Sequence, residues 1–250
     1  MQTMKKKLIA GNWKMNGGVE ANAALVQAIL AGLPVNACHV VFCVPAPYLS
    51  QVQQLLAETS VKFAAQDVSQ HTAGAFTGEV SAQMLREFAV QYCLVGHSER
   101  RQYHAESDAV VALKAQQALA AGITPIVCIG ETLQERSAGK TEEVVKRQLA
   151  AVIHANGHCI SEIVVAYEPV WAIGTGQTAS PEQAQQVHAV LRSQLRAATV
   201  HADRIPILYG GSMNAGNADA LLQQPDIDGG LVGGASLKAA EFLAIIQSAS

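Results

Sequence analysis

Short apolar runs alternate with longer amphipathic segments along the whole chain. The runs span four to six residues and are rich in Val, Ile and Ala, a pattern typical of parallel strands that are buried on both faces. We predict strands at Lys7–Gly11, His39–Val44, Lys62–Gln66, Gln91–Val95, Thr124–Ile129, Ile163–Tyr167, Pro206–Tyr209 and Gly229–Val232. We predict helices at Ala21–Ala31, Leu49–Thr59, Ala82–Phe88, Asp108–Ala120, Thr141–His154, Pro181–Ala198, Ala215–Gln223 and Lys238–Ser248.

This order of elements predicts the fold class. Eight strand-then-helix units within 250 residues are typical of an α/β protein of the (β/α)8 type, with eight parallel strands inside a layer of helices. No linker rich in Pro, Gly or Ser divides the chain, so we expect a single domain over residues 1–250. A doubly wound open sheet is the alternative, but no G-x-G-x-x-G follows the first predicted strand. A barrel would have its active site at the carboxyl ends of the strands.

Composition and charge narrow the classes of function. The chain is 50% hydrophobic and 15% charged, as a globular protein is. Its net charge of −3 and the lack of a long basic stripe argue against a nucleic-acid partner. No apolar stretch has the length of a membrane span, and only Leu8, Ile9 and Ala10 follow the basic run that ends at Lys7, which is too short for a secretory signal.

The cysteines indicate a reducing compartment. Five cysteines without C-x-x-C spacing, mostly within apolar runs, are typical of reduced, buried thiols, so we expect a cytoplasmic protein. Cys38 and His39 with Cys43 form the one cluster that resembles metal ligands. Because alternation along a strand would point these side chains in different directions, we predict no metal site there.

The stretch from Ile163 to Gly176 carries the clearest candidate chemistry. Its apolar run stops at Glu168-Pro169, because proline cannot donate to a strand ladder. One carboxylate therefore stands at the carboxyl end of a buried strand, beside an apolar loop that carries Trp171 and Ile173. We expect desolvation to raise the pKa of this carboxyl group, which would make it a usable base near neutral pH. A glycine-rich loop and a helix start at Ser180 follow.

The string A-Y-E-P-V-W-A-I-G-T-G resembles the catalytic strand end and lid loop of the triosephosphate isomerase family. The resemblance covers essentially the whole chain and implies a TIM barrel. After the first strand, G-N-W-K-M-N matches the family's opening motif. It implies that Asn12 and Lys14 face the substrate, and a lysine just past a barrel strand suits an anionic ligand.

A histidine follows the fourth strand in V-G-H-S-E-R-R, another family motif. Ser98 is predicted to begin a short helix, whose positive end would disfavour imidazolium and hold His97 neutral. The resemblance implies that this neutral imidazole donates a proton to a substrate oxygen and recovers it. The resemblance implies that Ser98 and Glu99 support the site.

Two glycine pairs follow the seventh and eighth strands, in Y-G-G-S and L-V-G-G-A-S-L. Barrels commonly build phosphate sites from backbone N–H groups at these two edges. We predict that Ser212, Gly233 and Gly234 bind phosphate together with Gly174. Met213 departs from the family, where a β-branched residue is usual, and we expect it to affect packing only.

The long loop of residues 67–79 resembles the subunit-interface loop of the family. A loop of this length in a compact domain is usually functional or disordered. The resemblance implies a homodimer in which Thr77 lies near Asn12 and Lys14 of the neighbouring subunit. At the fifth edge, C-I-G-E also matches, and we interpret Cys128 as a packing residue and Glu131 as a structural partner.

The implied activity is the interconversion of dihydroxyacetone phosphate and D-glyceraldehyde 3-phosphate, in which Glu168, His97, Lys14 and Asn12 act without a metal or cofactor. Two alternatives belong to other classes. One is a different phosphosugar barrel enzyme, such as an epimerase, which loss of activity with a chelator would favour. The other is a non-catalytic phosphate-binding protein that kept the glycine motifs.

Overall fold

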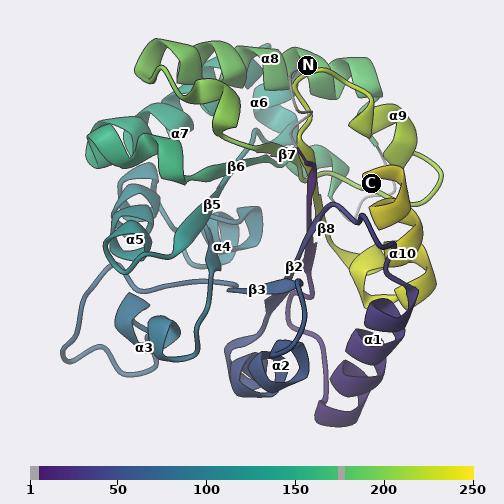
Figure 1. The fold of residues 1–250 in the computed structure, drawn as a ribbon. Helices are drawn as coiled ribbons and strands as arrows, with labels where there is room; N and C mark the ends of the chain where they lie inside the picture. Colours follow the sequence, from purple (N-terminus) through teal and green to yellow (C-terminus); the bar gives the residue numbers. More distant parts are fainter. Residues whose placement is uncertain (1–5, 174–177) are drawn as a thin grey trace.

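Eight parallel strands close into a barrel in the computed structural model, which describes residues 6–173 and 178–250 (Figure 1). Each strand pairs with its neighbours in chain order, and β1 pairs with β8 to close the barrel. The strands are β1 (Leu8–Asn12), β2 (His39–Val44), β3 (Lys62–Ala65), β4 (Tyr92–Val95), β5 (Thr124–Ile129), β6 (Val164–Tyr167), β7 (Ile207–Tyr209) and β8 (Gly229–Val232). The predicted (β/α)8 barrel is confirmed.

Strand side chains alternate between two cores, because successive residues of a strand point to opposite faces. One set fills the barrel interior: Leu8, Ala10, Val41, Cys43, Ala64, Leu94, Ile126, Cys128, Val164, Ala166, Leu208 and Leu231. The other set, which includes Ile9, Phe42 and Val165, packs outward against the helices. Burial on both faces explains why the strands read as apolar runs.

The helices lie around the outside of the strands (Figure 1). They are α1 (Val19–Gly32), α2 (Leu49–Leu56), α3 (Ala82–Glu87), α4 (Ser98–Tyr103), α5 (Asp108–Ala120), α6 (Leu133–Ser137), α7 (Thr141–Asn156), α8 (Pro181–Ala198), α9 (Ala218–Leu222) and α10 (Ala239–Ser248). Short 3-10 turns are η1 (Ala46–Tyr48), η2 (Gly157–Glu162), η3 (Val170–Ala172), η4 (Ala202–Arg204) and η5 (Gly234–Leu237). The predicted starts of α4 at Ser98 and of α8 after Ser180 are confirmed.

Helix α6 was not predicted from the sequence. Its signal was present, because the Thr132 side chain accepts from the backbone N–H of Glu135 while the Glu135 carboxylate accepts from the N–H of Thr132. This capping box begins a helix of only five residues, too short for an apolar periodicity to show.

The five cysteines are free thiols, and all but Cys159 are buried. Burial raises the pKa of Cys38 to about 11 and that of Cys128 well above its usual value, so both remain protonated and packed. Within residues 6–173 and 178–250, no three His, Cys, Asp or Glu side chains gather as a metal site would require. The same residues contain no helix that is long and apolar enough to cross a membrane.

Candidate active site

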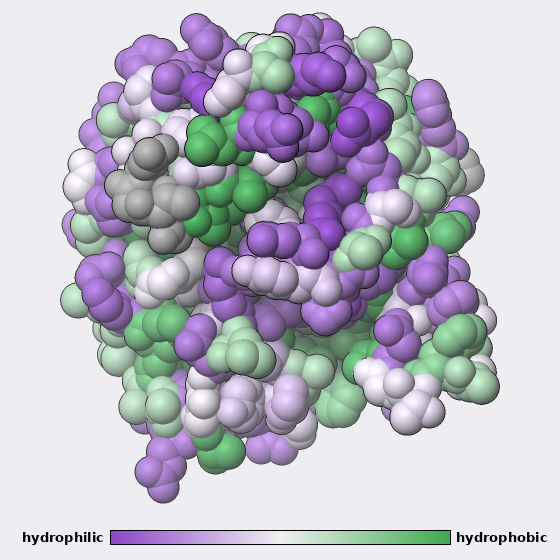
Figure 2. Space-filling model, turned by 180° about the vertical axis from the view of Figure 1, so that it is seen from behind, coloured by the Kyte–Doolittle hydropathy of each residue, from purple (hydrophilic) through white to green (hydrophobic). Residues whose placement is uncertain are grey.

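A cavity of about 360 Å³ opens at the carboxyl ends of the strands. Seven residues singled out from the sequence line it: Asn12, Lys14, His97, Glu168, Ser212, Gly233 and Gly234. They come from the ends of β1, β4, β6, β7 and β8, so barrel closure brings together segments that are far apart in the chain. In Figure 2, which shows the face opposite to that of Figure 1, hydrophobic and hydrophilic side chains meet around a recess near the centre.

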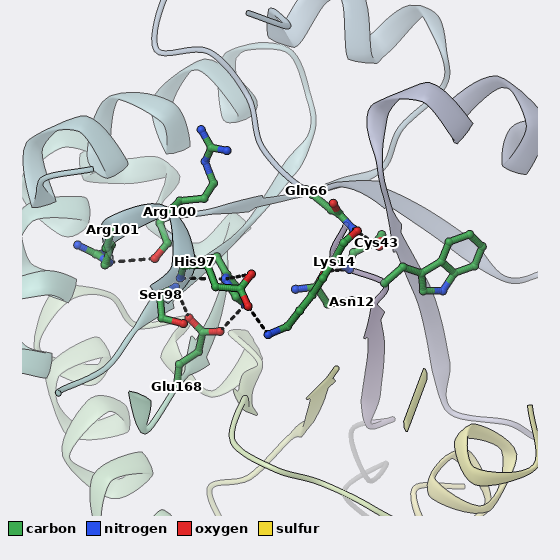
Figure 3. Close-up of polar contacts among 12 residues, drawn as sticks. Asn12, Lys14, Cys43, Gln66, His97, Ser98, Arg100, Arg101 and Glu168 are labelled. Atoms are coloured by element: carbon green, nitrogen blue, oxygen red, sulfur yellow. Dashed lines mark hydrogen bonds and ion pairs between the residues drawn. The ribbon is translucent and has the colours of Figure 1, made fainter. Parts of the chain in front are cut away.

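Glu168 follows β6 directly and is only 2% exposed. Its backbone N–H donates to the carbonyl of Ile129 at 2.7 Å, which extends the β5–β6 ladder by one residue. Its carboxylate is held at both oxygens. Oε2 accepts from the Ser98 backbone N–H at 2.9 Å, and Oε1 lies 2.9 Å from His97 Nε2 (Figure 3). The predicted base and the predicted imidazole are thus direct partners.

His97 is the N-terminal cap of α4. Its Nδ1 accepts from the Glu99 backbone N–H at 3.2 Å, so the lone pair of Nδ1 is used and the ring proton belongs on Nε2. Nε2 in turn points at Glu168 and borders the cavity. This geometry defines which nitrogen could donate a proton to a bound ligand.

The protonation of the pair differs from the sequence prediction. Burial alone would raise the pKa of Glu168, but His97, the Ser98 N–H and Lys14 together lower the pKa below its usual value. Burial likewise lowers the pKa of His97, yet Glu168 and then Glu99 raise it above its usual value. The predictions that the pKa of Glu168 is raised and that the start of α4 holds His97 neutral are therefore wrong for this arrangement. Contact between the two groups outweighs the desolvation of each.

The end of β1 presents Lys14 and Asn12. Lys14 has a positive φ of 52°, uncommon for a residue other than glycine, and its Nζ lies 2.5 Å from Glu99 Oε1. The Lys14 N–H donates to Asn12 Oδ1 at 3.0 Å. The lysine ammonium therefore enters the cavity from a backbone held in a strained form, a feature typical of functional sites.

Gln66 was missed as a site residue. Its amide donates to Asn12 Oδ1 at 3.3 Å, to the Lys14 carbonyl at 2.9 Å and to the Cys43 carbonyl at 3.0 Å (Figure 3). It thus holds the end of β1 against the end of β2. The signal was its position just past β3, because active-site residues lie at the carboxyl ends of barrel strands. We had assigned a function at this edge only to the following loop.

Glycines form the opposite side of the cavity. A Cβ at Gly210 would lie 2.9 Å from Glu168 Cγ, so this position allows close approach of the base. At Gly233 a Cβ would lie 3.6 Å from Lys14 Cε, and at Gly234 it would meet open space. Met213 is buried, and its Sδ would be 2.6 Å from a Cβ at Gly230 of β8, so it packs beneath this edge as expected.

Glu131 and Trp171 connect the segment after Glu168 to β5. Glu131 Oε1 accepts from Trp171 Nε1 at 2.9 Å, from the Tyr167 hydroxyl at 3.2 Å and from Arg136 at 3.3 Å. Glu131 is a structural partner, as predicted. Ile173 lines the cavity, whereas the predicted phosphate contact Gly174 lies outside the described residues.

The remaining supporting residues lie around the rim. Ser98 contributes its backbone N–H to Glu168, and Glu99 holds Lys14. Thr77 is exposed on the 67–79 loop and does not line the 360 Å³ cavity. A second cavity of about 570 Å³ shares Asn12, Lys14 and His97 with the first one.

Fold and site together define a (β/α)8-barrel enzyme with an acid–imidazole pair, a lysine and a glycine-lined edge. A family model described as "Triosephosphate isomerase" matches residues 7–249. The chain therefore belongs to the triosephosphate isomerase family, as its motifs indicated.

Relatives match over nearly the full length. The chain is 72% identical over 246 residues to the triosephosphate isomerase of Albidiferax ferrireducens, with 98% of this chain and 100% of the relative covered. It is 73% identical over 249 residues to that of Paracidovorax citrulli, with 98% and 99% covered, and 71% identical over 247 residues to that of Delftia acidovorans, with 98% and 100% covered. These relatives do not favour either alternative function.

Proposed function

We propose that this protein is an aldose–ketose isomerase that interconverts dihydroxyacetone phosphate and D-glyceraldehyde 3-phosphate, a reaction of glycolysis and gluconeogenesis. The observation that carries the proposal is the pairing of Glu168 with His97 inside a 360 Å³ cavity that also presents Lys14, Asn12 and a glycine edge. A carboxylate and an imidazole at one cavity wall can move two protons between adjacent carbon and oxygen atoms.

Glu168 is proposed to act as the base. Its carboxylate takes the proton from C1 of dihydroxyacetone phosphate, and the released electron pair forms a C1–C2 double bond. The C2 oxygen receives the proton of His97 Nε2, which gives an enediol. Glu168 then returns its proton to C2, while the oxygen on C1 gives its proton back to His97. Atoms and charges balance, and both groups end as they began.

The proton transfer requires Glu168 to turn from the Ser98 N–H toward the substrate carbon. This movement removes the hydrogen bonds that lower the pKa of Glu168, while its burial, which raises that pKa, remains. For His97, loss of the Glu168 contact leaves burial, the largest cause, and Lys14 to lower the pKa, with only the weaker Glu99 charge to raise it. Substrate binding would therefore shift each pKa in the direction that the reaction needs.

Groups on two sides of the cavity are proposed to bind the charged parts of the substrate. Lys14 supplies fixed positive charge toward the enediolate and the phosphate, and Asn12 orients a substrate oxygen. Backbone N–H groups of Ser212, Gly233 and Gly234 are proposed to hold the phosphate, with Gly174 as a further contributor. Open space at the Gly234 Cβ position supports this role, because packing within the protein does not explain a glycine there.

The protein is also proposed to work as a homodimer. The 570 Å³ cavity lies beside the active site, and two of its lining residues, Met15 and Tyr103, are 96% and 71% exposed. A second copy could place its loop tip, with Thr77, into this cavity next to Lys14. Ser98 and Glu99 would support the same site from within the subunit. We further propose that residues 1–250 act as one domain and that the protein works in the cytoplasm.

The deciding experiment measures turnover of glyceraldehyde 3-phosphate with a chelator present, for wild type and for Glu168→Gln. We expect fast turnover by the wild type, and a decrease of about 10³-fold or more in the variant, because a carboxamide cannot accept the proton. Absence of turnover in a folded wild type would contradict the proposed activity. Full activity of Glu168→Gln would contradict the role of the base.

A further inference from the structure

Gln148, on the outer helix α7, is a buried residue without a role in the chemistry above. It is 6% exposed, although it carries a polar amide. The amide oxygen accepts from the Gly130 backbone N–H at 2.7 Å, and the amide nitrogen donates to the Gly130 carbonyl at 3.2 Å. One side chain therefore binds both polar groups of a single residue, just past the end of β5.

Gly130 lies directly against the backbone of Glu168. A Cβ at Gly130 would be 1.7 Å from the Glu168 carbonyl oxygen, so no other residue fits without moving one of the two segments. On either side, the Glu168 N–H donates to the Ile129 carbonyl at 2.7 Å, and the Val170 N–H donates to the Glu131 carbonyl at 3.1 Å. Residues 129–131 thus support the backbone of the proposed base, Glu168.

We propose that Gln148 is a positioning residue for Glu168 and acts through Gly130. A glycine beyond the end of a strand has wide conformational freedom, and its polar groups need partners when they are buried. The Gln148 amide supplies both partners and so holds the Gly130 peptide in place. The Gly130 peptide in turn fixes the position of the Glu168 backbone at the end of β6. This inference rests on the proposed function, in which Glu168 is the base.

A merely structural role must be separated from a positioning role, since losing any buried hydrogen bond lowers stability. Asn156 offers the matched control. It is 8% exposed, lies on the same helix, and donates to the carbonyls of Val152 at 2.9 Å and Ala112 at 3.5 Å. These partners belong to helices α7 and α5 and not to the barrel rim.

The experiment compares Gln148→Met and Asn156→Leu with the wild type. We expect both variants to lower the thermal midpoint. Only Gln148→Met should lower kcat, by about 10- to 100-fold, because small displacements of a catalytic group have effects of this size. Inhibition by inorganic phosphate should stay within about twofold, since the glycine edge is untouched. A kcat within about twofold of wild type, or a loss equal to that of Asn156→Leu, would overturn the proposal.

Gln148→Glu provides a second variant in case Gln148→Met does not fold. Its carboxylate can still accept from the Gly130 N–H but cannot donate to the carbonyl when it is ionised. We therefore expect an intermediate loss of kcat at pH 8, partly recovered as acid restores a donor. A kcat equal to that of the wild type at pH 8 would contradict the inference.

A double variant tests whether Gln148 acts through Glu168. In the Glu168→Gln background there is no base to position, so adding Gln148→Met should lower the residual kcat by less than about twofold. A full 10- to 100-fold further loss would show another route and would refute the proposal. Wild type and Glu168→Gln alone decide the proposed function, whereas Gln148→Met in an active background decides the role of Gln148.

Discussion

The two halves of the barrel mouth are built in different ways. At the ends of β4–β6, side chains are held by hydrogen bonds: Glu168 by His97 and Ser98, and His97 by Glu99. At the ends of β7 and β8, the surface is mainly backbone, with Gly234 open to the cavity. The first half fixes the position and protonation of reacting groups. The second half leaves room for a ligand to approach the main chain.

The two halves suit different contributions to catalysis. Proton transfer needs a carboxylate and an imidazole with defined orientation, and only packed side chains provide that. Phosphate binding needs N–H groups without a side chain in the way, and glycine provides that. Substitutions in the β4–β6 half should therefore change kcat, and substitutions in the glycine half should change KM.

The largest expected effect is that of His97→Gln, in the side-chain half. The glutamine amide can still form a hydrogen bond with Glu168 but cannot cycle a proton, so we expect kcat to fall by about 10²- to 10⁴-fold. Inhibition by inorganic phosphate should change little. His201, which is exposed, offers the control His201→Gln. Unchanged turnover in His97→Gln would remove the basis for contrasting the two halves.

A pH-dependent effect on stability is expected from His188 on α8, which packs against the side-chain half through Tyr167. Its ring meets Tyr167 of β6 edge-on, and its Nδ1 lies 3.1 Å from the Asp226 carbonyl ahead of β8. Burial lowers the pKa of His188 to about 4, although Asp226 and Asp228 act in the opposite direction. Between pH 6.5 and about 4, His188 binds a proton in the unfolded chain but stays neutral in the folded protein.

The stability due to neutral His188 is therefore complete above pH 6.5 and decreases as pH falls toward 4. Between pH 7 and pH 5 we expect a loss of about 2 kcal/mol in the free energy of unfolding, measured by urea denaturation. In His188→Asn this part of the pH dependence should disappear. An identical pH dependence in variant and wild type would show that His188 does not titrate as its burial requires.

Gly234→Ala tests the glycine half with a smaller effect. Since its Cβ would meet open space in the protein, folding and the thermal midpoint should be unchanged. The methyl group would stand where the phosphate is proposed to bind, so KM should rise about tenfold, the loss of roughly one hydrogen bond to a charged group. Gly18→Ala, another position with open space, is the control and should leave KM unaltered.

The smallest effect concerns backbone strain away from the mouth. Ala105, between α4 and α5, has φ of 52°. Glycine adopts this conformation without the Cβ clash, so Ala105→Gly should stabilise the fold by up to about 1 kcal/mol. Turnover should not change. A shift in kcat would mean that the α4–α5 connection influences His97, and the two halves would then be less separable than we propose.

Local sequence predicted most of the fold. The bounds predicted for the strands His39–Val44, Thr124–Ile129 and Gly229–Val232 and for the helices Asp108–Ala120 and Pro181–Ala198 agree with the structure. Apolar runs and end signals act over a few residues, so they can be read without the fold. The short helix α6 was not found by periodicity, because five residues complete barely more than one turn.

The order of strands and helices follows from local sequence patterns, and so do the positions of Asn12, Lys14, His97 and Glu168 at strand ends. How these residues affect one another depends on the folded chain and could not be predicted from local patterns. Trp171, shortly after Glu168 in the chain, donates its indole N–H to Glu131. By contrast, His97 and Ser98, about 70 residues away in sequence, hold the Glu168 carboxylate and reverse its expected pKa shift. Gln66 and Gln148 likewise act on backbone that lies far from them in sequence. Electrostatic and hydrogen-bond energies depend on distance in space, and closure of the barrel sets those distances.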